Sequence, residues 1–162
     1  MRNLVLGIVG VLLGLWMGAG RWVFGVGGEL TWWYLPLIGV PFAILQLWAV
    51  IRMRIAGNRG RPVARGAYVT MILSWACAVA FGLTVPDLVD GELVSIAGHF
   101  GGPLWNEMAI ALCNPFGIIA FVMAIAALVI AWLSGREPGP TEDELLDAAE
   151  EAGMVPHPLS RD

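Results

Sequence analysis

Long apolar stretches alternate with short polar ones along the chain, and this pattern predicts its architecture. Four apolar blocks cover approximately residues 4–26, 30–52, 67–86 and 106–133. Each is about as long as, or longer than, the 20 residues that an α-helix needs to cross the hydrocarbon core of a bilayer. We therefore predict an all-α integral membrane protein, with four transmembrane helices in one domain over residues 1–134.

Aromatic and proline residues mark the ends and weak points of these blocks. Aromatic side chains favour the membrane interface, and tryptophans stand near the ends of the second and fourth blocks: Trp32, Trp33, Trp48, Trp105 and Trp132. Pro36 and Pro41 predict a kink in the second helix, because proline removes a helical hydrogen bond. Asn114-Pro115 predicts a kink in the fourth helix, or a break that lines a cavity.

Composition supports the membrane assignment. The chain is 58% hydrophobic and 14% charged, whereas a soluble domain carries about 25% charged residues. All basic side chains apart from histidine are arginine, and Ala, Gly, Val and Leu are abundant, as is typical of a GC-rich bacterial genome. In the first block, Gly18-Ala19-Gly20 leaves signal-peptide cleavage as an alternative, which the length of the apolar run disfavours.

The arginines predict the orientation. Five of the nine lie in the segment 52–65 between the second and third blocks: Arg52, Arg54, Arg59, Arg61 and Arg65. Short arginine-rich loops stay on the cytoplasmic side. Both termini are then cytoplasmic (N-in/C-in), with Arg2, Arg136 and Arg161 also inside. Arg21 alone lies outside, where we expect its long side chain to reach the interface. The predicted location is the bacterial inner (plasma) membrane.

Two polar segments lie outside the spans. The outer loop 87–107 carries Asp87, Asp90, Glu92, His99 and Glu107, and a short interfacial helix is predicted near residues 90–97. The cytoplasmic tail 135–162 is acidic. A Gly/Pro linker over 134–140 connects the tail to the fourth block, and a capping box from Thr141 to Glu144 follows it. The tail therefore predicts a short helix over 142–152 and disorder over 155–162.

The first helix carries a glycine series that forms one face: Gly7, Gly10, Gly14 and Gly18. Glycines four residues apart allow two helix backbones to approach closely. The face is predicted to pack either against another helix of this chain, the third or fourth, or against another chain.

Few polar side chains lie within the blocks: Gln46, Thr70, Ser74 and Asn114. Gln46 and Asn114 lie at different depths, so they are not expected to pair. Together with Pro115 they form the candidate intramembrane polar and kink site.

Catalytic chemistry is weakly indicated. No acid, histidine or arginine falls in the middle of a block, Cys77 and Cys113 lie in separate blocks, and no metal-ligand spacing is present. No metal, cofactor or nucleic-acid partner is expected. The outer acids with His99 leave an acid/base site as one alternative.

The leading functional hypothesis is a small non-catalytic subunit or assembly factor of a larger bacterial membrane complex. The expected partners are other membrane subunits and, at the arginine loop, anionic lipid headgroups. The acidic tail of this chain lies on the same side and could bind the same arginines in place of lipid. The alternatives are a small oligomeric transporter or channel and, third, a membrane enzyme using the outer acidic loop.

Overall fold

Four long helices form the body of the protein in a computed structural model that describes residues 2–136 and 142–152. They are α1 (Arg2–Ala19), α3 (Val40–Asn58), α4 (Arg65–Thr84) and α6 (Pro103–Ser134). A 3₁₀ turn, η1 (Gly20–Phe24), extends α1, and a short helix, α2 (Thr31–Tyr34), precedes α3. The predicted helical architecture is confirmed to this extent: four helical stretches are long and apolar enough to cross a membrane.

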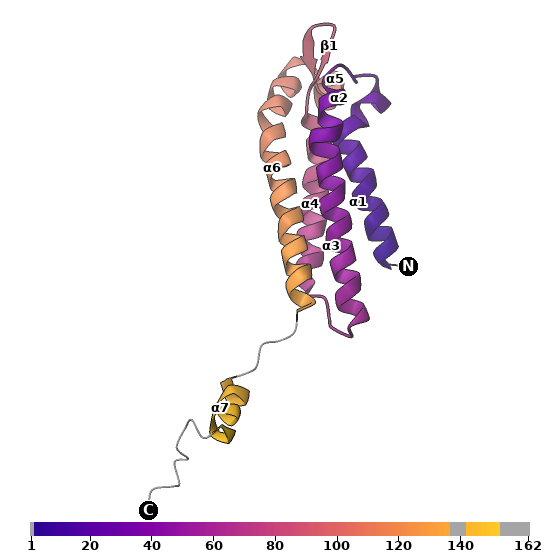
Figure 1. The fold of residues 1–162 in the computed structure, drawn as a ribbon. Helices are drawn as coiled ribbons and strands as arrows, with labels where there is room; N and C mark the ends of the chain where they lie inside the picture. Colours follow the sequence, from indigo (N-terminus) through magenta and orange to yellow (C-terminus); the bar gives the residue numbers. More distant parts are fainter. Residues whose placement is uncertain (1, 137–141, 153–162) are drawn as a thin grey trace, which may run out of the picture.

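The helices form a bundle with two distinct ends (Figure 1). The start of α1, the α3–α4 connection and the end of α6 lie at one end, called here the arginine end. A β-hairpin and a short helix, α5 (Ile96–Gly101), lie at the other, called here the hairpin end. Helix α6 packs along α4 and α3, while α1 packs mainly along α3 on the far side of the bundle.

The prolines of the second span change its helix type. Residues Leu35–Gly39, between α2 and α3, form a π-helical turn (η2) in which the N–H of Val40 bonds to the carbonyl of Leu35. Pro36 lies inside this turn and Pro41 at the start of α3. The predicted disturbance is thus present as a π-turn, in which the hydrogen bonds skip one residue more than in an α-helix.

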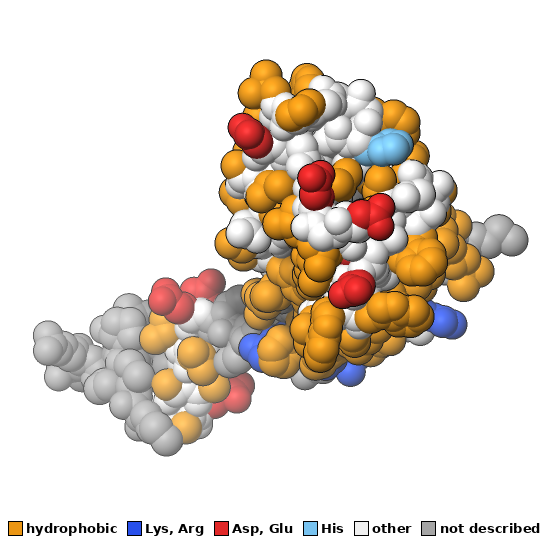
Figure 2. All heavy atoms as spheres, turned by 90° about the horizontal axis from the view of Figure 1, so that it is seen from above, with side chains coloured by type: hydrophobic (Ala, Val, Ile, Leu, Met, Phe, Trp, Pro, Cys, Tyr) orange, Lys and Arg blue, Asp and Glu red, His pale blue; other side chains and the backbone are white. Residues whose placement is uncertain are grey.

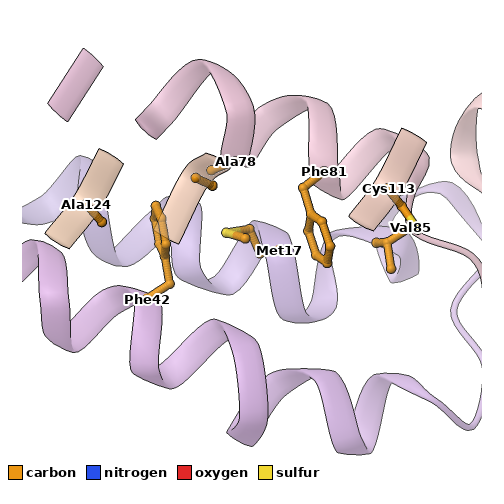
Figure 3. Close-up of a cluster of buried hydrophobic side chains, with 8 residues drawn as sticks. Met17, Phe42, Ala78, Phe81, Val85, Cys113 and Ala124 are labelled. Atoms are coloured by element: carbon orange, nitrogen blue, oxygen red, sulfur yellow. The ribbon is translucent and has the colours of Figure 1, made fainter. Parts of the chain in front are cut away.

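Small side chains allow the helices to pack closely. Ala120, Ala124, Ala127 and Ala131 recur along one face of α6 and are all fully buried or nearly so. Residues from all four helices meet between them in a core cluster that includes Met17, Phe42, Ala78 and Ala124 (Figure 3). Close packing provides the stabilising contacts between helices, because lipid tails are as apolar as the core itself.

The hairpin end differs from the prediction. Strands β1 (Asp87–Val89) and β2 (Glu92–Val94) pair antiparallel, and α5 covers Ile96–Gly101. The predicted helix near 90–97 is therefore wrong over most of its length. Asp90 and Gly91 both have positive φ, 51° and 84°, which is the geometry of a tight two-residue hairpin turn.

The fourth span and a segment of the tail are helical, as predicted. Helix α6 continues without interruption through Asn114 and Pro115, so the fourth span is not broken there. The tail helix α7 covers Glu142–Glu151, one residue short of the predicted range. Residues 137–141, which hold most of the predicted linker and the capping residue Thr141, lie outside the described residues. The predicted disorder over 155–162 also lies outside them.

Candidate functional site

The glycine face of α1 lies inside the bundle. A Cβ atom added to Gly14 would be 2.6 Å from the carbonyl oxygen of Gly39, and one added to Gly10 would be 2.6 Å from Cβ of Gln46. At Gly18 it would meet Leu35 at 2.8 Å. The second span thus covers most of this face, rather than the third or fourth span expected from the sequence. Gly10, Gly14 and Gly18 are therefore not open to another chain.

Gln46 is part of a polar chain at the middle of the bundle. Its Nε2 donates to Oγ of Ser74 at 3.0 Å, and its Oε1 accepts from Nε1 of Trp75 at 3.2 Å. Ser74 in turn donates to the carbonyl of Ala120 at 2.8 Å. These bonds connect α3, α4 and α6, and they satisfy the buried amide within the protein. The amide of Gln46 therefore contributes to the contact between these three helices.

The charged stretch 52–65 is only partly a loop. Arg52 and Arg54 lie on α3, and Arg65 begins α4. Arg59 and Arg61 each donate an Nη1 hydrogen bond to the carbonyl of Gly135, at 3.0 and 2.9 Å. Gly135 directly follows α6, so these cations satisfy a carbonyl at the negative end of its helix dipole.

Aromatic contacts hold two more arginines at this end. The guanidinium carbons of Arg52 and Arg136 lie 5.6 and 4.5 Å from the ring centroid of Trp132, within the range of cation–π attraction. The sequence shows the charge of this segment, whereas the structure shows that several of its arginines bind the C-terminal end of α6.

The acidic side chains at the hairpin end do not gather into a site. Figure 2 looks down on this end and shows the acids and the histidine dispersed among apolar and uncharged groups. Within residues 2–136 and 142–152, no group of three or more His, Cys, Asp and Glu side chains is placed to hold a metal ion. His99 is exposed on α5, while Asp87 is buried. The structure therefore does not bring the candidate acid/base residues together.

Asp87 instead forms a buried ion pair with Arg21. Nε of Arg21 donates to Oδ2 of Asp87 at 3.2 Å, and the two residues are only 1% and 0% exposed. The guanidinium also donates to the carbonyl of Gly18 at 2.8 Å and lies 4.6 Å from the ring centroid of Tyr34. The expectation that the side chain of Arg21 reaches the membrane interface is wrong, because the carboxylate of Asp87 holds the guanidinium inside the protein.

Hydrogen bonds fix the carboxylate of Asp87 from several segments. Oδ1 accepts from the backbone N–H groups of Leu30 and Leu88, at 2.9 and 2.8 Å, and Oδ2 accepts from the hydroxyl of Thr31 at 2.5 Å. Burial raises the pKa of Asp87, but the bonds from Thr31 and from the backbone outweigh burial and hold the pKa below its ordinary value. Asp87 thereby joins the hairpin to the first two spans.

This depressed pKa predicts a loss of stability in acid. A carboxyl whose folded pKa lies below its unfolded value contributes its full stabilisation above the unfolded pKa, which is about 3.9 for Asp. That contribution is lost as the pH falls through the folded pKa. We expect the free energy of unfolding, measured in detergent at descending pH, to fall more steeply below about pH 4 for the wild type than for Asp87→Asn. Parallel curves would contradict the prediction.

Asn114 lies on the outer surface of α6, in its apolar part. Its side chain is exposed, and its Oδ1 is 3.9 Å from Sγ of Cys113. Its amide nitrogen donates no hydrogen bond within the described ranges. At about 1.5 Å per residue, Asn114 lies about 13 Å along the helix from Trp105 and about 27 Å from Trp132. Asn114 thus lies between Trp105 and Trp132, within a helix that is long and apolar enough to cross a membrane.

The surroundings of Asn114 form an open apolar groove of about 410 Å³. Ile38, Phe81, Gly117 and Ile118 line it, together with Phe121, Val122 and Ile125. Pro115, in the same turn, has no N–H to donate to the carbonyl of Ala111. This surface, called here the Asn114 groove, therefore combines apolar walls with the amide of Asn114.

Sequence reasoning identified Asn114 and Pro115, but it missed the buried pair. Arg21 and Asp87 stand at the ends of the first and third apolar blocks, where the predicted topology places both on the outer side. Their opposite charges at a shared depth were the available signal. Comparisons of the chain with protein-family models, with curated proteins and with solved structures found no match.

Proposed function

We propose that this protein is a non-catalytic subunit or assembly factor that binds a transmembrane helix of a different membrane protein at the Asn114 groove. The observation that carries the proposal is an exposed amide in the apolar part of α6, with an open groove beside it. Polar side chains within spans normally face the interior of a bundle. A partner helix with an amide or hydroxyl group would give Asn114 the hydrogen bond that lipid does not.

The interior of the bundle supports binding rather than transport. The core clusters are filled with apolar and small side chains, and the buried Gln46 is satisfied by Ser74 and Trp75. A transporter of this size would need a polar path through the bundle or between copies of it. The Asn114 groove is open at the surface of the bundle, and its walls are mostly apolar.

We further propose that the arginine end faces the cytoplasm of a bacterial cell and that the four helices span its inner membrane. The expected cytoplasmic arginines outnumber the outer ones by eight to one. Asp87 pairs with the single outer arginine, Arg21. Because Arg21 is buried and paired with Asp87, its charge would not oppose the orientation that the arginine end favours. Labelling of single cysteines from each side of intact cells measures this orientation.

Site-specific photocrosslinking tests the partner proposal. A crosslinking residue at Val122, which lines the groove and is 51% exposed, should yield an adduct with a second membrane protein in cells, to be identified by mass spectrometry. The matched position is Val5, 57% exposed on α1, which should not yield it. Asn114→Leu should lower the Val122 yield about tenfold at subsaturating partner, since one interhelical hydrogen bond contributes about 1–2 kcal/mol.

Bulk added to the groove gives a second test that leaves the amide in place. Ile118→Trp should reduce the adduct, whereas Ile8→Trp on α1 should not, since the two isoleucines are 64% and 51% exposed. An unchanged unfolding midpoint shows that each variant is folded. Equal yields from wild type and both groove variants would overturn the proposal. An adduct between two copies of this chain would also overturn it and favour the oligomeric alternative.

A further inference from the structure

A second groove lies at the arginine end, between α1 and α3, and has a volume of about 760 Å³. The glycine contacts explain why it is there. Towards the hairpin end the two helices are so close that a Cβ at Gly10 would be 2.6 Å from Cβ of Gln46, whereas a Cβ at Gly7 would be 3.5 Å from Cδ2 of Leu47. Figure 1 shows the two helices separating in the same direction. The groove is the space opened by this divergence.

The groove is polar at its mouth and apolar beneath. Arg2 and Asn3, at the start of α1, and Arg54, in the last turns of α3, line the groove near the ends of these helices, and Leu4, Val11 and Leu47 give it apolar walls. Its lining within the described residues includes no acidic side chain. A cationic mouth above an apolar channel complements a molecule with an anionic head and a hydrocarbon chain.

Both arginines are available at this mouth. Arg2 is held by Tyr68, to whose hydroxyl its Nη2 donates at 3.2 Å and over whose ring its guanidinium carbon lies at 5.4 Å. A guanidinium has five N–H donors, so this bond leaves others for a ligand. Arg54 is exposed on the last turns of α3. Arg59, in contrast, donates to the end of α6.

We propose that this groove, called here the lipid groove, binds one anionic phospholipid, with its phosphate between Arg2 and Arg54 and an acyl chain against Leu4, Val11 and Leu47. Guanidinium groups bind phosphate oxygens through paired, charge-assisted hydrogen bonds. The N–H groups in the first turn of α1 lack acceptors within the helix, and they point out of the bundle at the arginine end, where the phosphate would lie. Basic pockets between spans at the cytoplasmic side are suited to anionic headgroups. The site is independent of the Asn114 groove.

The test is a titration of the purified full chain in detergent with phosphatidylglycerol and phosphatidylcholine, followed by native mass spectrometry. The wild type should bind one phosphatidylglycerol in preference to phosphatidylcholine. Each lost arginine contact should weaken phosphatidylglycerol binding about fivefold, so Arg54→Gln should show this loss. The matched control is Arg65→Gln, an exposed arginine at the start of α4 outside the groove, which should change binding less than about twofold.

A second variant separates lipid from free phosphate. Gly7→Leu should fill the apolar part of the groove and leave both arginines in place. It should weaken binding of phosphatidylglycerol but leave any binding of inorganic phosphate unchanged. Three results would overturn the proposal: equal losses in Arg54→Gln and Arg65→Gln, equal binding of the two lipids by the wild type, or full binding of phosphatidylglycerol by a folded Gly7→Leu variant.

Discussion

Asp87→Asn is expected to destabilise the protein by about 3–5 kcal/mol, because it leaves the buried charge of Arg21 without a counterion. Arg21 is 1% exposed, and the nearest alternative partners in the structure are the carbonyl of Gly18 and the ring of Tyr34. Neither of these groups carries a negative charge. The free energy of unfolding in mixed detergent micelles measures the effect.

A double variant provides the control for this prediction. Arg21→Met with Asp87→Asn removes both charges, and it should recover at least half of the loss, since a buried pair is often replaced by apolar groups at little cost. A loss below about 1 kcal/mol in Asp87→Asn alone would contradict the prediction. It would mean that Arg21 reaches the interface, as the sequence alone suggested.

Gly14→Leu is expected to separate α1 from the rest of the bundle and to cost about 3 kcal/mol, the upper end of the usual range for over-packing. The added side chain would begin 2.6 Å from the carbonyl oxygen of Gly39 and 2.9 Å from Cβ of Ala43. Neither atom is the end of a flexible side chain, so the two backbones must move apart. Dispersion contacts along the interface between α1 and α3 would then be lost.

Gly7→Leu is the matched control, because it makes the same change on the same helix, at a site where an added Cβ would lie 3.5 Å from Cδ2 of Leu47, an ordinary van der Waals contact. It should keep an unfolding midpoint close to that of the wild type, whereas the midpoint of Gly14→Leu falls. Equal midpoints for the two variants would contradict the close approach at Gly14. Trp16 fluorescence offers a further readout, since its Nε1 donates to the carbonyl of Val79 on α4 at 3.2 Å.

The hairpin shows a local signal that sequence reasoning overlooked. Asp90-Gly91 stands between Val89 and Glu92, and an adjacent pair of apolar residues lies on each side of it, Leu88-Val89 and Leu93-Val94. Asp-Gly in this setting is a strong indication of a type I′ turn, because both residues tolerate positive φ. The prediction of an interfacial helix gave more weight to the spacing of apolar residues than to this turn, and the structure contradicts it.

Other features were not readable from local sequence at all. Arg21 and Asp87 are 66 residues apart in the chain, and their pairing depends on where the hairpin returns over the first two spans. Likewise, the glycine face of α1 can be recognised in the sequence, but the helix that packs against it cannot be identified from the sequence. Gly14 and Gly39 meet because α1 and the second span pack together, and the glycine spacing is compatible with several partners.

The sequence by itself determined the four long apolar helical stretches, their approximate ends and the separation of charge between the two ends of the molecule. These properties follow from transfer free energies, which add along a segment whatever lies beside it. Only the tertiary structure decided the neighbours of Gly14, Gln46 and Arg21, and that Asn114 points outwards. Those outcomes depend on how the helices pack, because each helix carries several surfaces and the packing selects which of them are buried.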